Sequence, residues 1–78
     1  MKVSMLWFDE NRDLEIEQRI ERASEYYHSK YGQKPNVCFV HPEAIDKDNR
    51  VVRTALKVRS SETLLLDHFW IGIEEELD

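Results

Sequence analysis

The sequence contains one cysteine, two glycines, two prolines and no long apolar run, and these shortages exclude several protein classes. Because Cys38 has no second cysteine to pair with, an intramolecular disulfide framework is excluded, and a lone cysteine is typical of a reducing compartment. No apolar stretch approaches the ~20 residues that span a bilayer. Asp9 and Glu10 interrupt the apolar N-terminal segment before a signal peptide is complete. We therefore expect a cytoplasmic protein without membrane contact.

The sequence also lacks the spacings that mark metal and catalytic sites. It contains no CxxC or HxxxH pair, although zinc sites commonly use such spacings. It has no glycine-rich phosphate loop and no ordered set of serine, histidine and aspartate. A small enzyme or metal site centred on Asp67, His68 and His41 stays an alternative, although neighbouring strand residues such as Asp67 and His68 face opposite ways. We predict no catalytic residue, metal ligand or cofactor, and we expect binding rather than catalysis.

The length and composition are typical of one small globular domain, residues 1–78, with 35% charged and 41% hydrophobic residues. A domain of this size buries only roughly 60–65% of the surface that its unfolded chain exposes, so oligomerisation is a common supplement to its stability. The net charge of −5 argues against non-specific nucleic-acid binding. Acidic residues concentrate in 9–25 and 74–78, whereas 50–59 is basic, so the charges are segregated along the chain.

A helix is predicted over residues 13–31, where the apolar period changes from two to about 3.6. Its acidic start suits the positive end of the helix dipole. Gly32 follows the helix and suits a left-handed C-terminal position, with Pro35 shortly beyond. The apolar stripe of this helix consists of Ile16, Ile20, Ala23, Tyr27 and Tyr31.

Four strands are predicted around this helix. Residues 3–8 and 36–41 are short apolar runs, and with the helix between them they are compatible with a right-handed parallel crossover. Residues 42–45 predict a helical turn and Asp48-Asn49 a second turn. Residues 51–60 alternate, with Val52, Thr54, Leu56 and Val58 on one face and Arg53, Ala55, Lys57 and Arg59 on the other. The predicted fold class is α/β (α+β), a two-layer sandwich of one long helix on about four strands in the order β-α-β-β-β.

The last predicted strand, residues 64–73, is apolar on both alternating sets, which is typical of a central strand. Its helix-facing set is Leu65, Asp67, Phe69, Ile71 and Ile73. An aspartate at that position either has a perturbed pKa or marks the end of the sheet or an error in the register. The short link 60–63 predicts a hairpin with 51–60. This register places Arg59 opposite Leu64, Lys57 opposite Leu66 and Arg53 opposite Trp70, and a loop with an odd count would exchange the faces.

The other face of this predicted hairpin has no second helix to cover it. An apolar patch of several hundred Å² usually marks an interaction site. We therefore predict a protein–protein interaction module that forms a homodimer, or binds a protein partner, through this face. The alternative is a nucleic-acid-binding module that uses Arg53, Lys57, Arg59 and Trp70. The predicted partner-binding residues are Leu64, Leu66, Trp70, Arg53, Lys57 and Arg59.

Two segments, Tyr27 with Lys30-Tyr31-Gly32 and Pro35-Asn36, and His68-Phe69-Trp70-Ile71-Gly72, resemble a short uncharacterised prokaryotic protein family. The resemblance extends over most of the chain. The family has no assigned function, so the resemblance implies none for this chain.

Overall fold

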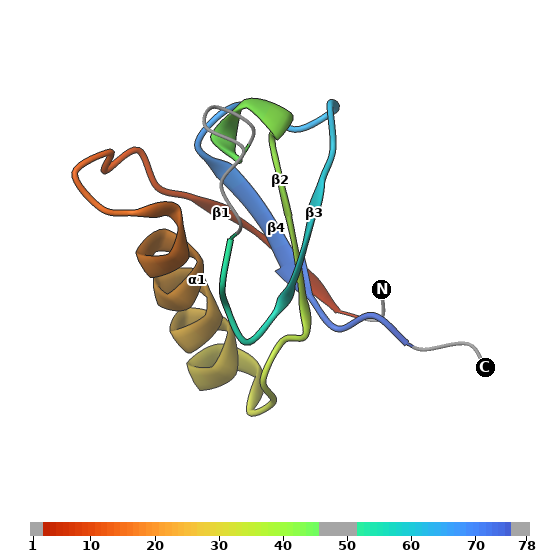
Figure 1. Ribbon diagram of the computed structural model, residues 1–78. Coiled ribbons are helices and arrows are strands. Elements are labelled where there is room, and N and C mark those ends of the chain that lie inside the picture. Colours follow the sequence, from red (N-terminus) through yellow and green to blue (C-terminus); the bar gives the residue numbers. More distant parts are fainter. Residues whose placement is uncertain (1–2, 46–51, 76–78) are drawn as a thin grey trace.

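The computed structural model describes residues 3–45 and 52–75, and in these ranges one helix packs on a four-stranded mixed sheet (Figure 1). The predicted fold class and element order are confirmed, including the helical turn after the second strand. The turn predicted at Asp48-Asn49 lies outside the described residues. The elements are β1 (Ser4–Phe8), α1 (Ile16–Tyr31), β2 (Val37–Val40), the 3-10 helix η1 (Pro42–Ala44), β3 (Lys57–Ser60) and β4 (His68–Gly72).

Local side-chain and backbone bonds fix both ends of α1. The helix begins three residues after the start of the predicted range, because Glu15 is its N-cap and forms a capping box with Gln18. The Glu15 N–H donates to Oε1 of Gln18 at 2.9 Å. At the other end Gly32 adopts φ 73°, and its N–H donates to the His28 carbonyl at 2.8 Å. The predicted left-handed position of Gly32 is therefore confirmed.

The order of the strands in the sheet is β1-β4-β2-β3. β4 pairs antiparallel with both β1 and β2, whereas β2 and β3 are parallel. The strands β1 and β2 therefore run in the same direction with β4 inserted between them, a split β-α-β unit. β4 is therefore paired along both of its edges, but only one of its two residue sets, with Phe69 and Ile71, faces the core.

The predicted hairpin between 51–60 and 64–73 is wrong. β3 lies beside β2, where the Lys57 N–H donates to the Asn36 carbonyl at 2.9 Å and the Ser61 N–H to the Val40 carbonyl at 2.8 Å. β2 therefore separates β3 from β4. The three predicted pairings, Arg59 with Leu64, Lys57 with Leu66 and Arg53 with Trp70, do not occur, and both strands are shorter than predicted.

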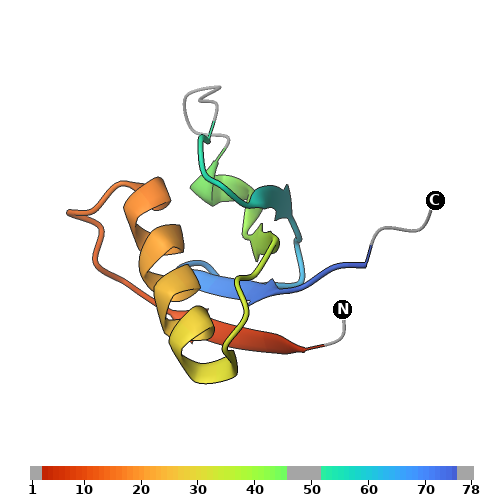
Figure 2. The same cartoon turned by 90° about the horizontal axis from the view of Figure 1, so that it is seen from below.

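The hydrophobic core lies between α1 and one face of the sheet (Figure 2). Four predicted stripe residues of α1 are buried there, while Tyr31 is 38% exposed at the end of the helix. Phe69 and Ile71 of β4 are buried as predicted, but Leu65 is 71% exposed because it precedes the strand. The segment before β3 packs on the same side through Leu56. The whole core cluster consists of Ile16, Ile20, Ala23, Tyr27, Cys38, Val40, Leu56, Phe69 and Ile71.

Candidate functional site

The face of the sheet opposite α1 carries no helix or strand within the described ranges. The residues on this face can be identified because side chains alternate between the two faces of a sheet. Met5, Trp7, Phe69 and Ile71 belong to the helix-side core, so their neighbours along each strand point to the opposite face. The same alternation holds in β2 and β3. We call this face of the sheet the open face. Its strand residues are Ser4, Leu6, Phe8, Val37, Phe39, Lys57, Arg59, His68, Trp70 and Gly72, of which Val37 and Gly72 are buried.

One row of directly opposed residues crosses all four strands of the open face. Leu6 lies opposite Trp70, Trp70 opposite Phe39, and Phe39 opposite Arg59. Leu6 is 61% exposed and Trp70 is 42% exposed. Phe8, two residues further along β1 and on the same face, is 55% exposed. Exposed apolar residues are ordinary when they are scattered, whereas Leu6, Phe8 and Trp70 lie close together on one face of the sheet.

A shallow hollow of about 360 Å³ lies on the open face around Trp70. Glu74 forms a polar border of this hollow, and its carboxylate is 3.2 Å from the Arg59 guanidinium. The Asn36 side chain fixes the Glu74 backbone, accepting from its N–H at 2.7 Å and donating to its carbonyl at 2.9 Å. The face therefore combines an apolar centre with a charged margin. The hollow is lined by Ser4, Phe39, Ser61, Trp70 and Glu74.

The structure brings half of the predicted partner-binding residues onto this surface. Trp70, Lys57 and Arg59 lie on the open face, on the side opposite the helix. The other three do not belong to a strand. Leu64 is buried in the turn after β3, Leu66 lies in the turn before β4, and Arg53 is an exposed residue of the segment before β3. Their predicted placement on the open face is wrong.

The sequence predictions missed the accessible apolar residues that β1 and β2 place on the open face, which are Leu6, Phe8 and Phe39. Leu6 and Phe8 alternate with Met5 and Trp7 in β1, so the signal for two-sided apolarity was present in residues 3–8. Phe39 similarly alternates with core residues of β2. Without the strand order, however, nothing in the sequence places these side chains beside Trp70.

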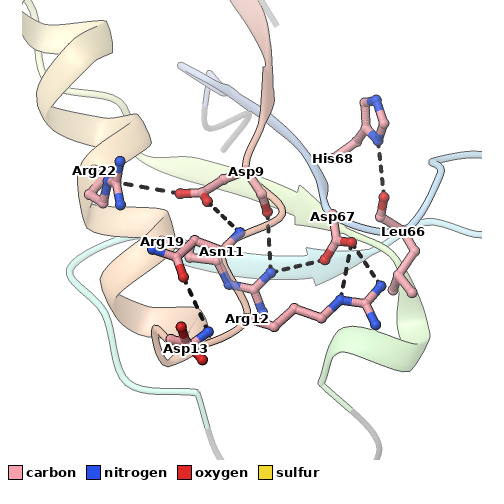
Figure 3. A network of polar contacts seen from close by, with 9 residues as sticks. All are labelled: Asp9, Asn11, Arg12, Asp13, Arg19, Arg22, Leu66, Asp67 and His68. Carbon is pink, nitrogen blue, oxygen red and sulfur yellow. Dashed lines mark hydrogen bonds and ion pairs between the residues drawn. The ribbon is translucent and has the colours of Figure 1, made fainter.

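A network of charged side chains lies at the start of β4 and explains why the strand begins only at His68 (Figure 3). Asp67 adopts φ 66°, a left-handed conformation that interrupts strand alternation. Its Oδ2 accepts from Nη2 of Arg12 at 2.8 Å, and its Oδ1 accepts from Nη1 of Arg19 at 3.0 Å. The same Nη1 donates to the carbonyl of Asp9 at 3.3 Å. The network ties the segment after β1 to the turn before β4.

Asp67 lies just before β4 and not within a strand as predicted, but its carboxylate is directed toward α1, where it accepts from Arg19. Its pKa is perturbed downward, since the hydrogen bond from Arg12 and then the charges of Arg12 and Arg19 outweigh the effect of burial. The carboxylate therefore stays ionised at neutral pH. Arg19 also places its guanidinium 5.5 Å from the centre of the Phe69 ring. Asp67 is a structural anchor, because its carboxylate joins Arg12 of the segment after β1 to Arg19 of α1.

His41 and His68 each lie at hydrogen-bonding distance from a nearby backbone group, and Cys38 is buried. Nδ1 of His41 accepts from the Glu43 N–H at 3.1 Å, and Nδ1 of His68 lies 3.1 Å from the Leu66 carbonyl oxygen. Cys38 is buried, and desolvation raises its thiol pKa to about 12, so the thiol is protonated at neutral pH. In residues 3–45 and 52–75, no group of three or more histidine, cysteine, aspartate and glutamate side chains is arranged to hold a metal ion.

Comparison of the chain with protein-family models, with curated proteins and with solved structures gives no match. None of the helices in the described ranges has the length and apolarity needed to cross a membrane.

Proposed function

We propose that this chain is a protein–protein interaction module that forms a twofold homodimer through the open face. The observation that supports this proposal is the apolar row Leu6–Trp70–Phe39, which crosses three neighbouring strands without a covering layer among the described residues. Leu6 and Trp70 are exposed, and Phe39 is half-buried. A C2 contact needs a surface complementary to itself, and an apolar row can meet its own copy without pairing like charges. The buried, protonated thiol of Cys38 is compatible with the reducing cytoplasm.

The distribution of charge on the open face supports the same proposal. Trp70 and Phe39 lie on the two central strands, whereas Lys57 and Arg59 lie on the edge strand β3. Protein interfaces have this anatomy, in which aromatic residues occupy the centre and charged residues form a solvated rim. Arg59 is already paired with Glu74 at 3.2 Å, so contact between two copies need not strip an unpaired guanidinium of water.

The size of the face sets the expected strength of the dimer. Four strands about 4.8 Å apart and about five residues long cover roughly 300 Å² in projection. A standard interface buries about 800 Å² on each partner. Weak and transient contacts lie at the small end of the interface size range, so we expect a dissociation constant in the micromolar range rather than the nanomolar range.

The proposal is tested by sedimentation velocity of the full chain from about 1 to 300 µM, a range that brackets micromolar dissociation constants. Two leucine variants form a matched pair, because Leu6 is 61% exposed on the open face and Leu65 is 71% exposed in the turn before β4. Leu6→Thr keeps a strand-forming residue and is expected to weaken association by at least about tenfold. Leu65→Thr is expected to leave it unchanged. A monomeric mass at every concentration, or equal effects of the two variants, contradicts the proposal.

A second candidate function is the binding of single-stranded nucleic acid. The observation that favours it is the opposition of Phe39 and Trp70 on the central strands beside Lys57 and Arg59, since aromatic side chains on a sheet can stack bases while cations hold phosphates. The net charge of −5 and the Arg59–Glu74 pair weigh against it. Anisotropy of a labelled single-stranded oligonucleotide tests it. Salt-sensitive binding that Lys57→Glu abolishes would favour this function, and unchanged anisotropy would exclude it.

A further inference from the structure

The strand β1 forms one edge of the sheet, and no described strand lies beyond it. Its backbone groups divide into two sets. The Asp9 N–H donates to the Asp67 carbonyl at 3.0 Å, and the Ile73 N–H donates to the Val3 carbonyl at 3.4 Å. Hydrogen-bonded pairs alternate along an antiparallel ladder, so the odd-numbered residues of β1 bond to β4. The N–H and C=O groups of the even-numbered residues, Ser4, Leu6 and Phe8, therefore point away from the sheet.

This edge has none of the features that normally prevent strand addition. Proteins protect exposed edges with charged side chains, proline, bulges or very short strands. The segment Ser4-Met5-Leu6-Trp7-Phe8 has no charge, proline or glycine, and it pairs with β4 in register along its whole length. The opposite edge strand, β3, is shorter and carries Lys57 and Arg59. β1 is therefore the edge that is suited to accept another strand.

We propose that β1 pairs antiparallel with β1 of a second copy, about a twofold axis at Leu6. This register sets Leu6 opposite its own copy and Ser4 opposite Phe8, and all three residues have their backbone groups directed outward. Each such pair exchanges two N–H···O bonds, which gives about six bonds across the axis. Because β1 has no charged side chain, the contact opposes no like charges. On the helix side, Trp7 would lie opposite Met5 of the second copy, and both are partly buried in the single chain.

The inference goes beyond the face-to-face dimer, since it uses the backbone of the edge rather than the side chains of the face. A twofold axis that makes two edge strands antiparallel is perpendicular to the sheet, so both open faces lie on the same side. The joined sheet has eight strands, and its open face doubles from roughly 300 to roughly 600 Å² in projection. This approaches the about 800 Å² of a standard interface. Edge pairing and face packing together assemble four copies with D2 symmetry, two joined sheets packed on each other.

The test is the mass of the full chain and of two Ser4 variants by sedimentation equilibrium. Ser4→Pro removes an outward N–H and places the proline ring at the edge, but it leaves the bonds between β1 and β4 intact. Ser4→Ala removes the same hydroxyl and keeps the N–H. We expect the wild type and Ser4→Ala to reach the mass of four copies, and Ser4→Pro to stop at two. Equal masses for Ser4→Pro and Ser4→Ala overturn the inference.

The failure of this inference and the failure of the proposed function give different results. If only the face associates, Trp70→Glu yields monomers and Ser4→Pro leaves the wild-type dimer. If only the edge associates, Ser4→Pro yields monomers and Trp70→Glu leaves a dimer. Amide hydrogen exchange keeps the inference testable if Ser4→Pro does not fold. Edge pairing predicts that the wild-type amides of Leu6 and Phe8 exchange more slowly as the protein concentration rises, and fast exchange of both at every concentration overturns it.

Discussion

Replacing Trp70 by glutamate is expected to weaken association through the open face at least about a hundredfold, which corresponds to about 2.7 kcal/mol. Buried tryptophans at the centre of an interface are frequent hot spots that contribute about 2 kcal/mol or more. The variant also brings a carboxylate of each copy into the apolar contact, where both would lose hydration. In the Ser4→Pro background, the mass by sedimentation velocity should fall from two copies to one. In the wild-type background it should fall from four copies to two.

Trp70→Phe is the matched control, since it keeps an aromatic ring on the open face and is expected to retain most of the association. Because Trp70 is 42% exposed and points away from the core, neither variant should lower the thermal stability of the monomer appreciably. An unchanged mass for a folded Trp70→Glu variant contradicts the proposed interface. If that variant instead leaves the mass unchanged but loses oligonucleotide binding, the nucleic-acid function is favoured.

Replacing Asp67 by alanine is expected to lower the free energy of unfolding by about 2–3 kcal/mol. The variant leaves the guanidinium of Arg19, only 11% exposed, without its carboxylate partner. It also places alanine at φ 66°, where aspartate is better tolerated. For a domain of this size the loss corresponds to a decrease in Tm of roughly 8–24 °C. Thermal denaturation followed by circular dichroism measures it.

Arg12→Ala is the control for the same network. Its guanidinium is 64% exposed, so the Arg12–Asp67 ion pair is screened by solvent, and Arg12→Ala should lower the free energy of unfolding much less than Asp67→Ala. Asp67→Asn should fall between the two variants, because asparagine tolerates the left-handed conformation and keeps one acceptor oxygen. A loss for Asp67→Ala no larger than that for Arg12→Ala would contradict the anchoring role of Asp67.

The pH dependence follows from the lowered pKa of Asp67. The unfolded chain protonates this carboxylate near pH 3.9, whereas the folded protein protonates it at a lower pH. The stabilisation is therefore fully present above about pH 4 and is lost as the pH falls through the folded pKa. Urea titrations of the wild type should show this loss, and Asp67→Asn should lack it.

Most of the fold could be predicted from the sequence because its signals are local. The α1 stripe and Gly32 define the helix within a few residues of its bounds, and short apolar runs mark the strands. Strand pairing is not a local property. The link after β3 is short enough for a hairpin, but β4 lies instead between β1 and β2, where both of its edges are paired. The alternation of residues 51–60 predicts which side chains share a face, but it does not predict that β3 pairs in parallel with β2.

The open face was predicted only in part for a related reason. Alternation within β4 and β3 places Trp70, Lys57 and Arg59 opposite the helix whatever the strand order. Leu64 and Leu66 were assigned to the same face because the apolar run continues unbroken from 64 to 66. The run leaves the strand at Asp67, whose left-handed conformation is held by Arg12 and Arg19. These partners lie 55 and 48 residues away in the sequence, beyond the reach of pattern reasoning.

The central claim, that two copies meet through the open face, is tested most directly by isotope-filtered NOE measurements on a mixture of labelled and unlabelled chains. The filter records only contacts between different copies. We predict cross-peaks from the Trp70 indole protons of one copy to the Leu6 methyl groups or the Phe39 ring protons of another. If the chain associates at the same concentration but the cross-peaks involve only the residues of α1, or if Trp70 has none, the account is contradicted.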